Sequence, residues 1–260
     1  MSYFSIPKLS SRVMTVWLRN WDVFMKTYKV NFLPPFIEPL LYLFALGFGL
    51  GTFIDEIEGM SYARFIAPAL IAISIMYSSF FECTFSSYVR MYYQKTFDAI
   101  IATPLSIEEV ITGELLWGAS RSLINATIML PILWAFGLIE LPESLLIIPF
   151  AFLAGLLFAT IAMCFTAISP NIMALNYPAF LFITPMFLFS GTFFPLSLLP
   201  EAVQYFALAV LPLTHVVTIV RSLTLGAVDG MLVFNLIWII VATAIFFLLS
   251  VNLMKRRLIA

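Results

Sequence analysis

The sequence predicts an all-α polytopic membrane protein with six transmembrane helices. Hydrophobic residues make up 62% of the 260 positions and charged residues only 10%, whereas a soluble domain carries roughly 25% charged residues. Ten of the thirteen lysines and arginines lie in the first 30 residues, in one central loop or in the last six residues, and acidic residues crowd the alternate loops. Because basic residues that flank a span stay on the cytoplasmic side, we expect both termini in the cytoplasm.

The segment 11–29 is expected to be an amphipathic helix on the membrane surface. Five apolar residues spaced three or four apart share one face, namely Val13, Trp17, Trp21, Phe24 and Tyr28. The basic residues Arg12, Arg19, Lys26 and Lys29 fall on the other face. Such a helix lies in the headgroup plane with its basic side toward the cytoplasm. The pattern leaves open whether this helix is a simple anchor or docks a partner.

Six apolar stretches define the expected spans, at about 35–54, 63–87, 107–138, 144–168, 172–194 and 231–254. The first apolar run begins only after five basic residues, so we expect no cleaved signal peptide and an uncleaved first span. Ser106 and Glu109 have the capping-box spacing and define the start of the third span. The sequence Ser169-Pro170-Asn171 separates the fourth and fifth spans by a tight turn.

The cytoplasmic loop between the second and third spans is expected to form a short helix at about 91–104. It mixes charged and apolar residues and closes at Pro104. Exposed Phe97, Ile100 and Ile101 would favour a protein partner. The alternative is that these side chains rest on the membrane surface.

The stretch 202–220 is also charge-free and long enough for a seventh span. A seventh span would place the basic C-terminus outside, against the positive-inside rule. Pro195, Pro200, Pro212 and His215 punctuate this region. We therefore expect 195–230 to form an external, partly re-entrant pair of short helices. Such backbone is tolerated where protein covers it or where it lines a water-filled path, so the region indicates a gated pathway.

Four ionisable residues fall within the expected spans: Glu38, Glu82, Glu114 and Arg121. Intramembrane charges are costly and are functional candidates by default. We expect Glu82 to pair with Arg121, with Glu114 two turns below Arg121 on the same face. Structural pairing is favoured over a proton or ion relay, because the fourth to sixth spans have no charge in their cores.

The sequence offers little for metal or nucleotide chemistry. Cys83 and Cys164 lie in expected spans without metal-ligand spacing and are interpreted as small buried hydrophobes. His215 is the single histidine, and no cluster of histidines and carboxylates for a catalytic metal is present. The chain contains no phosphate-binding loop of the Gly-x-x-x-x-Gly-Lys-Ser/Thr type, so we expect no ATPase site, bound metal or cofactor in this chain.

Several motifs, taken together and in order, resemble the permease subunits of ABC-2-type exporters, most closely the nodulation-factor (lipo-oligosaccharide) export permeases. They cover nearly the full chain. The motifs are Arg90-Met91 with Gln94-Lys95-Thr96-Phe97-Asp98-Ala99; Gly113-Glu114 with Trp117; Ser190-Gly191-Thr192-Phe193-Phe194-Pro195 with Leu199-Pro200; Leu211-Pro212-Leu213-Thr214-His215 with Arg221 and Leu225-Gly226; and Lys255-Arg256-Arg257.

The resemblance implies an interface segment at 1–33 followed by a transmembrane domain at 34–260, in the cytoplasmic membrane of a prokaryote. It implies a homodimer joined to two separate ATP-binding subunits, which would hold the ATP and magnesium, and an amphipathic or glycolipid substrate; no nucleic acid partner is expected. The 91–104 segment would be the coupling helix, through Met91, Gln94, Lys95, Thr96, Phe97, Asp98, Ile100 and Pro104. The outer gate would comprise Phe193, Phe194, Pro195, Pro200, Pro212, His215 and Arg221.

Three other functions were weighed. A drug-efflux permease of the same superfamily shares the layout. A secondary transporter also fits six spans, but should show inverted repeats and polar, broken helices near the midplane. An intramembrane glycosyl- or phosphotransferase would need clustered Asp, His or Arg residues at one membrane face, and this sequence has only scattered ones. Dependence of transport on ATP separates an ABC exporter from the secondary transporter.

Overall fold

The computed structural model describes residues 7, 9–28, 37, 40–54, 56–226 and 230–259. Throughout these residues the chain is helical, apart from turns and one isolated bridge between Ile57 and Met60. The α-helices are α1 (Val13–Lys26), α3 (Tyr62–Phe81), α4 (Thr96–Ile101), α5 (Ile107–Ala135), α6 (Ile147–Ile168), α7 (Asn176–Pro178), α8 (Thr184–Phe189), α9 (Glu201–Val210), α10 (Pro212–Thr224) and α11 (Gly230–Ile259).

Among the described residues, four helical stretches are long and apolar enough to cross a membrane: Tyr62–Tyr93, Glu143–Ile168, Ile172–Phe189 and Gly230–Ile259. The helices α9 and α10 together form a fifth candidate, bent by 90°. The helix α5 has 29 residues and, at about 1.5 Å per residue, is also long enough to span. Leu40–Thr52 is a shorter apolar helix within the expected first span. These helices make the chain a polytopic membrane protein.

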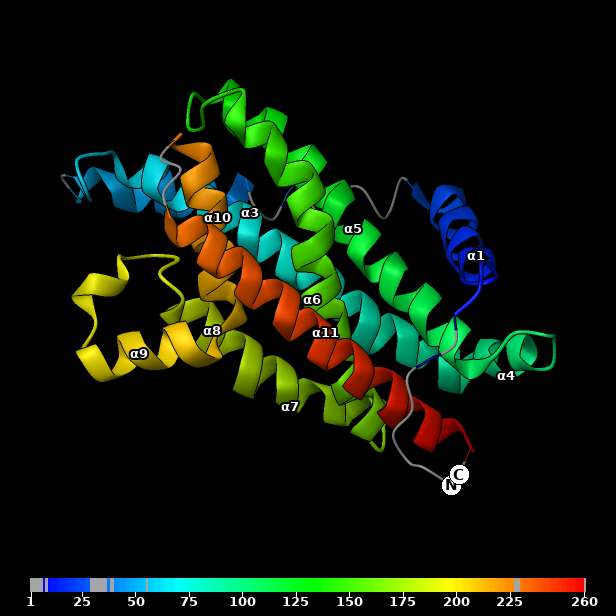
Figure 1. Ribbon diagram of the computed structural model, residues 1–260. Helices are drawn as coiled ribbons and strands as arrows, with labels where there is room; N and C mark the ends of the chain where they lie inside the picture. The colour runs from blue at the N-terminus through cyan, green and yellow to red at the C-terminus, as the bar shows by residue number, and fades with distance from the viewer. Residues whose placement is uncertain are drawn as a thin grey trace.

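The centre of the bundle is α6, which packs against α3, α5 and α11 (Figure 1). Small residues allow this close packing. A Cβ atom added at Gly155 of α6 would lie 2.5 Å from the Cβ atom of Ser122 on α5, and one at Gly118 of α5 would lie 2.5 Å from Sγ of Cys83. Small residues at helix contacts are typical of membrane bundles, where backbones must approach closely without a hydrophobic driving force.

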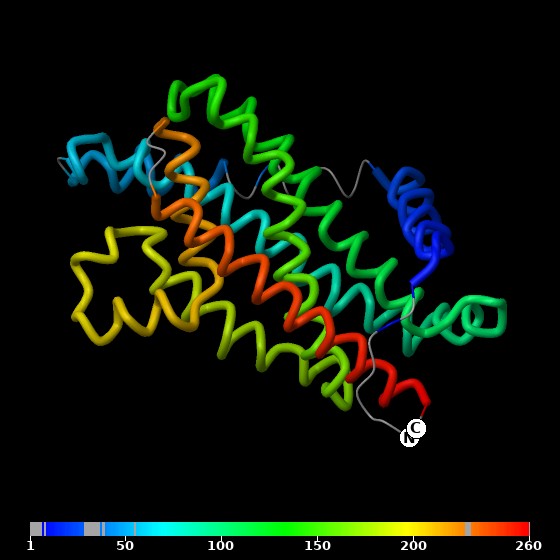
Figure 2. The backbone as a smooth tube through the Cα atoms, viewed as in Figure 1, coloured from blue at the N-terminus to red at the C-terminus, as the bar shows by residue number. Residues whose placement is uncertain are grey.

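The molecule has two chemically different ends (Figures 1 and 2). The α4 end contains α4, the start of α5, the turn between α6 and α7, and the last turns of α11. There Lys255 Nζ lies 2.5 Å from Glu108 Oε1, and Arg257 Nη1 donates to the carbonyl oxygens of Thr166 and Ser169 at 2.5 and 2.6 Å. Arg257 thus satisfies free carbonyl groups at the end of α6, where a cation is favoured.

The α9 end contains α9, α10 and the turn between α5 and α6. At this end Arg64 forms an ion pair with Glu140, and the Glu140 backbone N–H donates to the carbonyl oxygen of Thr224 at 3.1 Å. The 90° bend between α9 and α10 falls at Leu211 and Pro212. The described part of this region thus contains two short helices, α9 and α10, and an external, re-entrant position for them stays a prediction.

The structure does not have the single helix over 91–104 that the sequence predicts. The second long helix continues beyond 87 through two π-helical segments, at Glu82–Ser86 and Val89–Tyr93. Lys95 then adopts a left-handed conformation (φ 54°), and α4 runs only from Thr96 to Ile101. Phe97 is fully buried rather than exposed. The helix persists through Arg90 because that charge is paired inside the bundle instead of pointing to water.

The surface helix expected at 11–29 is present as α1, but its inward face differs from the expected one. Its buried residues are Val13, Val16, Asn20 and Phe24, and Tyr28 is exposed. Because Asn20 finds a buried acceptor on α5, the helix is rotated so that a polar residue lies in the contact. The half-buried Arg19 consequently lies beside the bundle and not on the opposite face.

Candidate functional site

Arg90 is the centre of a buried ionic cluster. Its Nη1 atom lies 2.8 Å from Oε1 of Glu82, and its Nη2 and Nε atoms lie 2.5 and 2.9 Å from Oε2 of Glu114. The side chains of Arg90 and Glu82 are 13% and 12% exposed, and that of Glu114 is fully buried. A buried charge is tolerated only when it is paired and hydrogen-bonded. Arg90 pairs with both carboxylates and donates hydrogen bonds to each of them.

Glu114 also connects α1 to the bundle. Asn20 Nδ2 donates to its Oε1 atom at 2.8 Å, and Ser87 Oγ donates to its Oε2 atom at 2.5 Å. One carboxylate therefore joins the surface helix, the long helix Tyr62–Tyr93 and α5. Gly113 permits this contact, because a Cβ atom there would lie 2.6 Å from the Cβ atom of Val16.

The expected pair between Glu82 and Arg121 exists only as a long contact. Arg121 Nε lies 3.8 Å from Glu82 Oε2, beyond hydrogen-bond distance. The Arg121 guanidinium instead lies 4.7 Å from the centre of the Phe24 ring, and its buried Nε atom has no hydrogen-bond partner among the residues that the structure describes. The principal partner of Glu82 is Arg90, although the sequence predicts a loop at that position.

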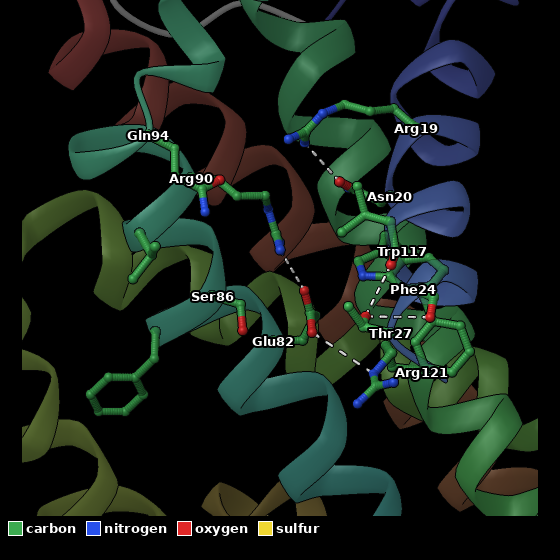
Figure 3. Close-up of a pocket in the computed structure, with 13 residues that line it drawn as sticks. Arg19, Asn20, Phe24, Thr27, Glu82, Ser86, Arg90, Gln94, Trp117 and Arg121 are labelled. Atoms are coloured by element: carbon green, nitrogen blue, oxygen red, sulfur yellow. Dashed lines mark hydrogen bonds and ion pairs between the residues drawn. The ribbon is translucent and has the colours of Figure 1, made fainter. Parts of the chain in front are cut away.

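A partly open groove of about 390 Å³ lies beside this cluster, between α1, the long helix Tyr62–Tyr93 and α5 (Figure 3). Three arginines and three aromatic residues line it: Arg19, Arg90, Arg121, Phe24, Phe85 and Trp117. Partial burial lowers the pKa of Arg19 below its usual value, and the negative charge of Glu114 opposes this shift. Arg19 is still a full cation at neutral pH.

Aromatic contacts lead from this groove toward the α9 end. Phe85 lines the groove and contacts Phe81, with ring centres 5.9 Å apart. Phe81 contacts Tyr77 at 5.6 Å, and Tyr77 stacks on Phe187 at 6.1 Å. Phe187 then meets Phe193 edge-on at 4.8 Å. These five rings, called here the aromatic ladder, join the groove to the expected gate region.

The expected coupling residues divide into a surface set and an anchoring set. Gln94, Lys95, Asp98 and Pro104 are exposed, Thr96 and Ile100 are half-buried, and Met91 and Phe97 are buried. The surface set lies on and around α4. The buried pair attaches this region to the bundle, so Phe97 cannot present its ring to a partner.

The segment that contains α4 is tied to its surroundings by hydrogen bonds. Arg12 Nη1 donates to the carbonyl oxygen of Pro104 at 2.6 Å. The capping box is formed as expected: the Ser106 backbone N–H donates to Glu109 Oε2 at 2.8 Å, and the Glu109 N–H donates to Ser106 Oγ at 3.2 Å. Ser10 Oγ additionally hydrogen-bonds Glu109 Oε1. These hydrogen bonds connect the segment that contains α4 to the start of α1 and to the start of α5.

The expected gate residues lie at the α9 end, away from the ionic cluster. His215 is fully buried; its Nδ1 atom lies 2.6 Å from Asn235 Oδ1, and its Nε2 atom lies 3.0 Å from the carbonyl oxygen of Leu208. Arg221 Nη2 donates to the carbonyl oxygen of Gly191 at 2.9 Å. These contacts hold α10 against α9, α11 and the chain after α8.

The other gate residues vary in exposure. Phe193 and Phe194 are half-buried, Pro195 and Pro212 are buried, and Pro200 is exposed. Glu38 lies outside the described residues. Cys83 and Cys164 are free and buried. In the part of the chain that the structure describes, no group of three His, Cys, Asp or Glu side chains could hold a metal ion.

A profile of the ABC-2 type transporter family matches residues 11–225. The chain is 33% identical to Nodulation protein J of Sinorhizobium fredii, over 95% of this chain and 94% of that protein. It is also 33% identical to Nodulation protein J of Rhizobium meliloti, over 98% and 97% of the two chains. Inner membrane transport permease YadH of Escherichia coli is 27% identical over 93% of this chain and 94% of its own.

Proposed function

The chain belongs to the ABC-2 type transporter family, and from this premise we propose that it is the membrane-spanning permease subunit of an ATP-driven exporter. The observation that carries the proposal is the family match, which covers α4 as well as the helices α9 and α10. The chain lacks a phosphate-binding loop. ATP would therefore be hydrolysed, with magnesium, by a separate subunit.

The proposed assembly is two copies of this chain with two ATP-binding subunits, in the cytoplasmic membrane of a bacterium. Six spans are proposed, with both termini and α4 in the cytoplasm. The charge distribution supports this orientation. Most described basic residues lie at the α4 end, whereas the α9 end carries Arg64 and Arg221 beside several glutamates. Basic flanks stay on the cytoplasmic side of a span.

The proposed coupling surface consists of Gln94, Lys95, Asp98 and Pro104 on and around α4. These side chains are exposed, while buried Phe97 attaches α4 to the bundle. A push on this surface would reach α1 through Arg12 and α5 through the capping box. The ionic cluster around Arg90 would carry the same movement into the long helix Tyr62–Tyr93.

The proposed substrate is an amphipathic lipid-linked oligosaccharide or polysaccharide. Support comes from full-length likeness to several proteins named Nodulation protein J, and from the likeness of the motifs to lipo-oligosaccharide exporters. Export of a hydrophobic drug is the second candidate, because drug-efflux permeases of the superfamily that the motifs resemble share the same layout. The aromatic ladder would suit either substrate.

The test is transport by purified protein in sealed vesicles. The chain would be co-purified with its ATP-binding subunit and reconstituted with a fluorescent lipo-oligosaccharide or a fluorescent hydrophobic drug. ATP-dependent movement of the lipo-oligosaccharide, abolished when the ATP-binding subunit is omitted, is the expected result. Movement driven by a proton gradient without ATP would contradict the proposal and favour a secondary transporter.

A further inference from the structure

We propose that the groove between α1, the long helix Tyr62–Tyr93 and α5 binds the phosphate-bearing head group of a membrane lipid. The inference rests on the proposed function, because it assigns a ligand chemistry to one site of the proposed exporter. Binding itself needs neither ATP nor a partner subunit. It can therefore be measured separately from transport.

The charges in and behind the groove leave one excess positive charge. Arg19, Arg90 and Arg121 line it together with Glu82, and Glu114 lies behind Arg90. Arg90 is engaged by both carboxylates. Within the described residues, Arg19 donates only to the neutral side chains of Asn20 and Thr96, at 2.9 and 3.4 Å. The groove therefore presents positive charge that the described residues do not neutralise.

Arg121 gives the second observation that indicates a ligand. Its side chain is only 14% exposed, and its buried Nε atom has no hydrogen-bond partner in the described part of the chain. Figure 3 shows the guanidinium beside the groove, on the other side of Glu82 from Arg90. A buried polar group without a partner is costly. A guanidinium binds a phosphate group through parallel hydrogen bonds, so the exposed part of the Arg121 side chain would hold a phosphate oxygen in the groove.

The position of the groove beside α1 and its apolar lining indicate a lipid rather than a soluble anion. One wall is α1, an amphipathic helix of the kind that lies at the headgroup level of a bilayer. Val23, Phe24, Phe85 and Trp117 provide apolar surface beside the arginines. Phe85 also begins the aromatic ladder. A molecule with a charged head and an apolar remainder matches both parts of this surface.

The experiment is fluorescence quenching of the full chain in phosphatidylcholine vesicles. A small fraction of the lipid carries bromine on its acyl chains, as phosphatidylglycerol or as phosphatidylcholine. Trp117 lines the groove, and the centres of the Trp17 and Trp21 rings lie 6.5 and 6.4 Å from the centre of the Trp117 ring. A lipid bound in the groove therefore quenches a cluster of three tryptophans. The expected result is stronger quenching by phosphatidylglycerol than by phosphatidylcholine.

The excess is the quenching by brominated phosphatidylglycerol minus that by brominated phosphatidylcholine. Variants test whether this excess comes from binding in the groove. The double variant Arg19→Gln/Arg121→Gln should lose the excess. Lys26→Gln, which removes an exposed charge from the same helix α1, should keep it. Glu82→Gln removes a negative charge from the groove and should increase the excess, which a misfolded protein would not do. Equal quenching by both lipids, or a full excess in the double arginine variant, would overturn the proposal.

Competition then identifies the source of the phosphate. Brominated phosphatidylglycerol is displaced either by unlabelled polyprenyl phosphate or by unlabelled phosphatidylglycerol. If polyprenyl phosphate displaces it at the lower mole fraction, the result supports a lipid-linked substrate. The reverse order would support a resident phospholipid in the same site. Displacement by inorganic phosphate alone, with no effect of either lipid, would contradict a lipid site. Loss of binding in a variant that still exports at the normal rate would leave the proposed function intact but show that the groove does not load substrate.

Discussion

At the scale of single residues, Arg90 joins the long helix Tyr62–Tyr93 to α5 through buried ion pairs. It contacts Glu82 and Glu114 simultaneously, and Glu114 is completely buried. Removing one partner of a buried ion pair costs about 3–5 kcal/mol, because the remaining charge is uncompensated. The electrostatic cost of this site therefore depends on all three side chains together.

We predict that Arg90→Gln lowers the free energy of unfolding by about 3–5 kcal/mol, measured by thermal unfolding in detergent. The double variant Arg90→Gln/Glu114→Gln should lose less than the sum of the two single variants, because contacting residues are not additive. Arg121→Gln removes a 3.8 Å contact with Glu82 and a contact with the Phe24 ring, but no hydrogen-bonded ion pair, and should lose less than Arg90→Gln. Additive losses for Arg90 and Glu114 would show that the two do not act as a pair.

Sequence reasoning succeeded for residues whose role depends on local spacing. The capping box of Ser106 and Glu109 was predicted and is present, because three positions of spacing determine it. The role of Arg90 was missed, since its partners are 8 and 24 residues away. One signal was available: Arg90 and Glu82 are separated by about two helical turns, so a continuous helix could place them on one face. The burial of Phe97 had no such signal, as it depends on how α4 folds back.

At the scale of elements, the crossing of α1 over α5 depends on the absence of a side chain at Gly113. A Cβ atom there would lie 2.6 Å from the Cβ atom of Val16 and 3.0 Å from the carbonyl oxygen of Val13. These distances are too short for van der Waals contact. The hydrogen bond between Asn20 and Glu114 depends on the same close approach.

We predict that Gly113→Ala displaces α1 and lowers the free energy of unfolding by about 1–3 kcal/mol, the usual cost of overpacking. Thermal unfolding measures the loss, and the fluorescence of Trp17, Trp21 and Trp117 reports the displacement, because their rings are in contact. Gly230→Ala is the matched control, since nothing lies within 4 Å of a Cβ atom there. Equal stability and fluorescence in the two variants would contradict this account of the crossing.

Element boundaries followed from the sequence where prolines or caps define them. The chain turns at Ser169-Pro170-Asn171, as the sequence predicts, and a new helix begins at Pro212. The end of the long helix at Tyr93 cannot be predicted in this way, because the charged residues after 87 indicate a loop. Two π-helical segments, Glu82–Ser86 and Val89–Tyr93, carry the helix onward, and π-helical turns are frequent at functional sites. The inward face of α1 was also misassigned, because Asn20 packs inside.

At the scale of the whole molecule, the two ends differ in charge and in the elements they contain. The α4 end gathers the last turns of α11, the start of α5 and the basic side chains that tie them together. The α9 end gathers the bent helix pair and the turn between α5 and α6. The proposed orientation requires these two ends to be on opposite sides of the membrane.

We predict that cysteines at positions 56 and 197 react with an impermeant thiol reagent in intact cells, whereas a cysteine at position 98 reacts only after permeabilisation. All three positions are exposed. A background without Cys83 and Cys164, which are buried, serves as the control for unspecific labelling. Labelling of position 98 from outside would invert the orientation and remove α4 from the cytoplasm.

We propose that the surface of α4 couples a separate ATP-binding subunit to export, and two ion pairs at opposite ends of the molecule allow a matched comparison. Lys95 and Asp98 form an exposed pair 3.7 Å apart at the α4 end, and Arg64 and Glu140 form an exposed pair at the α9 end. Exposed pairs contribute only about 0–1 kcal/mol to stability, so replacing either pair with alanines should preserve folding.

The measurement is ATP-dependent export by the reconstituted complex carrying Lys95→Ala/Asp98→Ala or Arg64→Ala/Glu140→Ala. Interface side chains that matter typically contribute about 1–2 kcal/mol, so the α4 variant should export about 10-fold more slowly, with weaker binding of the ATP-binding subunit or with hydrolysis uncoupled from export. The α9-end variant should export at the wild-type rate. Wild-type export by the α4 variant at equal expression would contradict the claim.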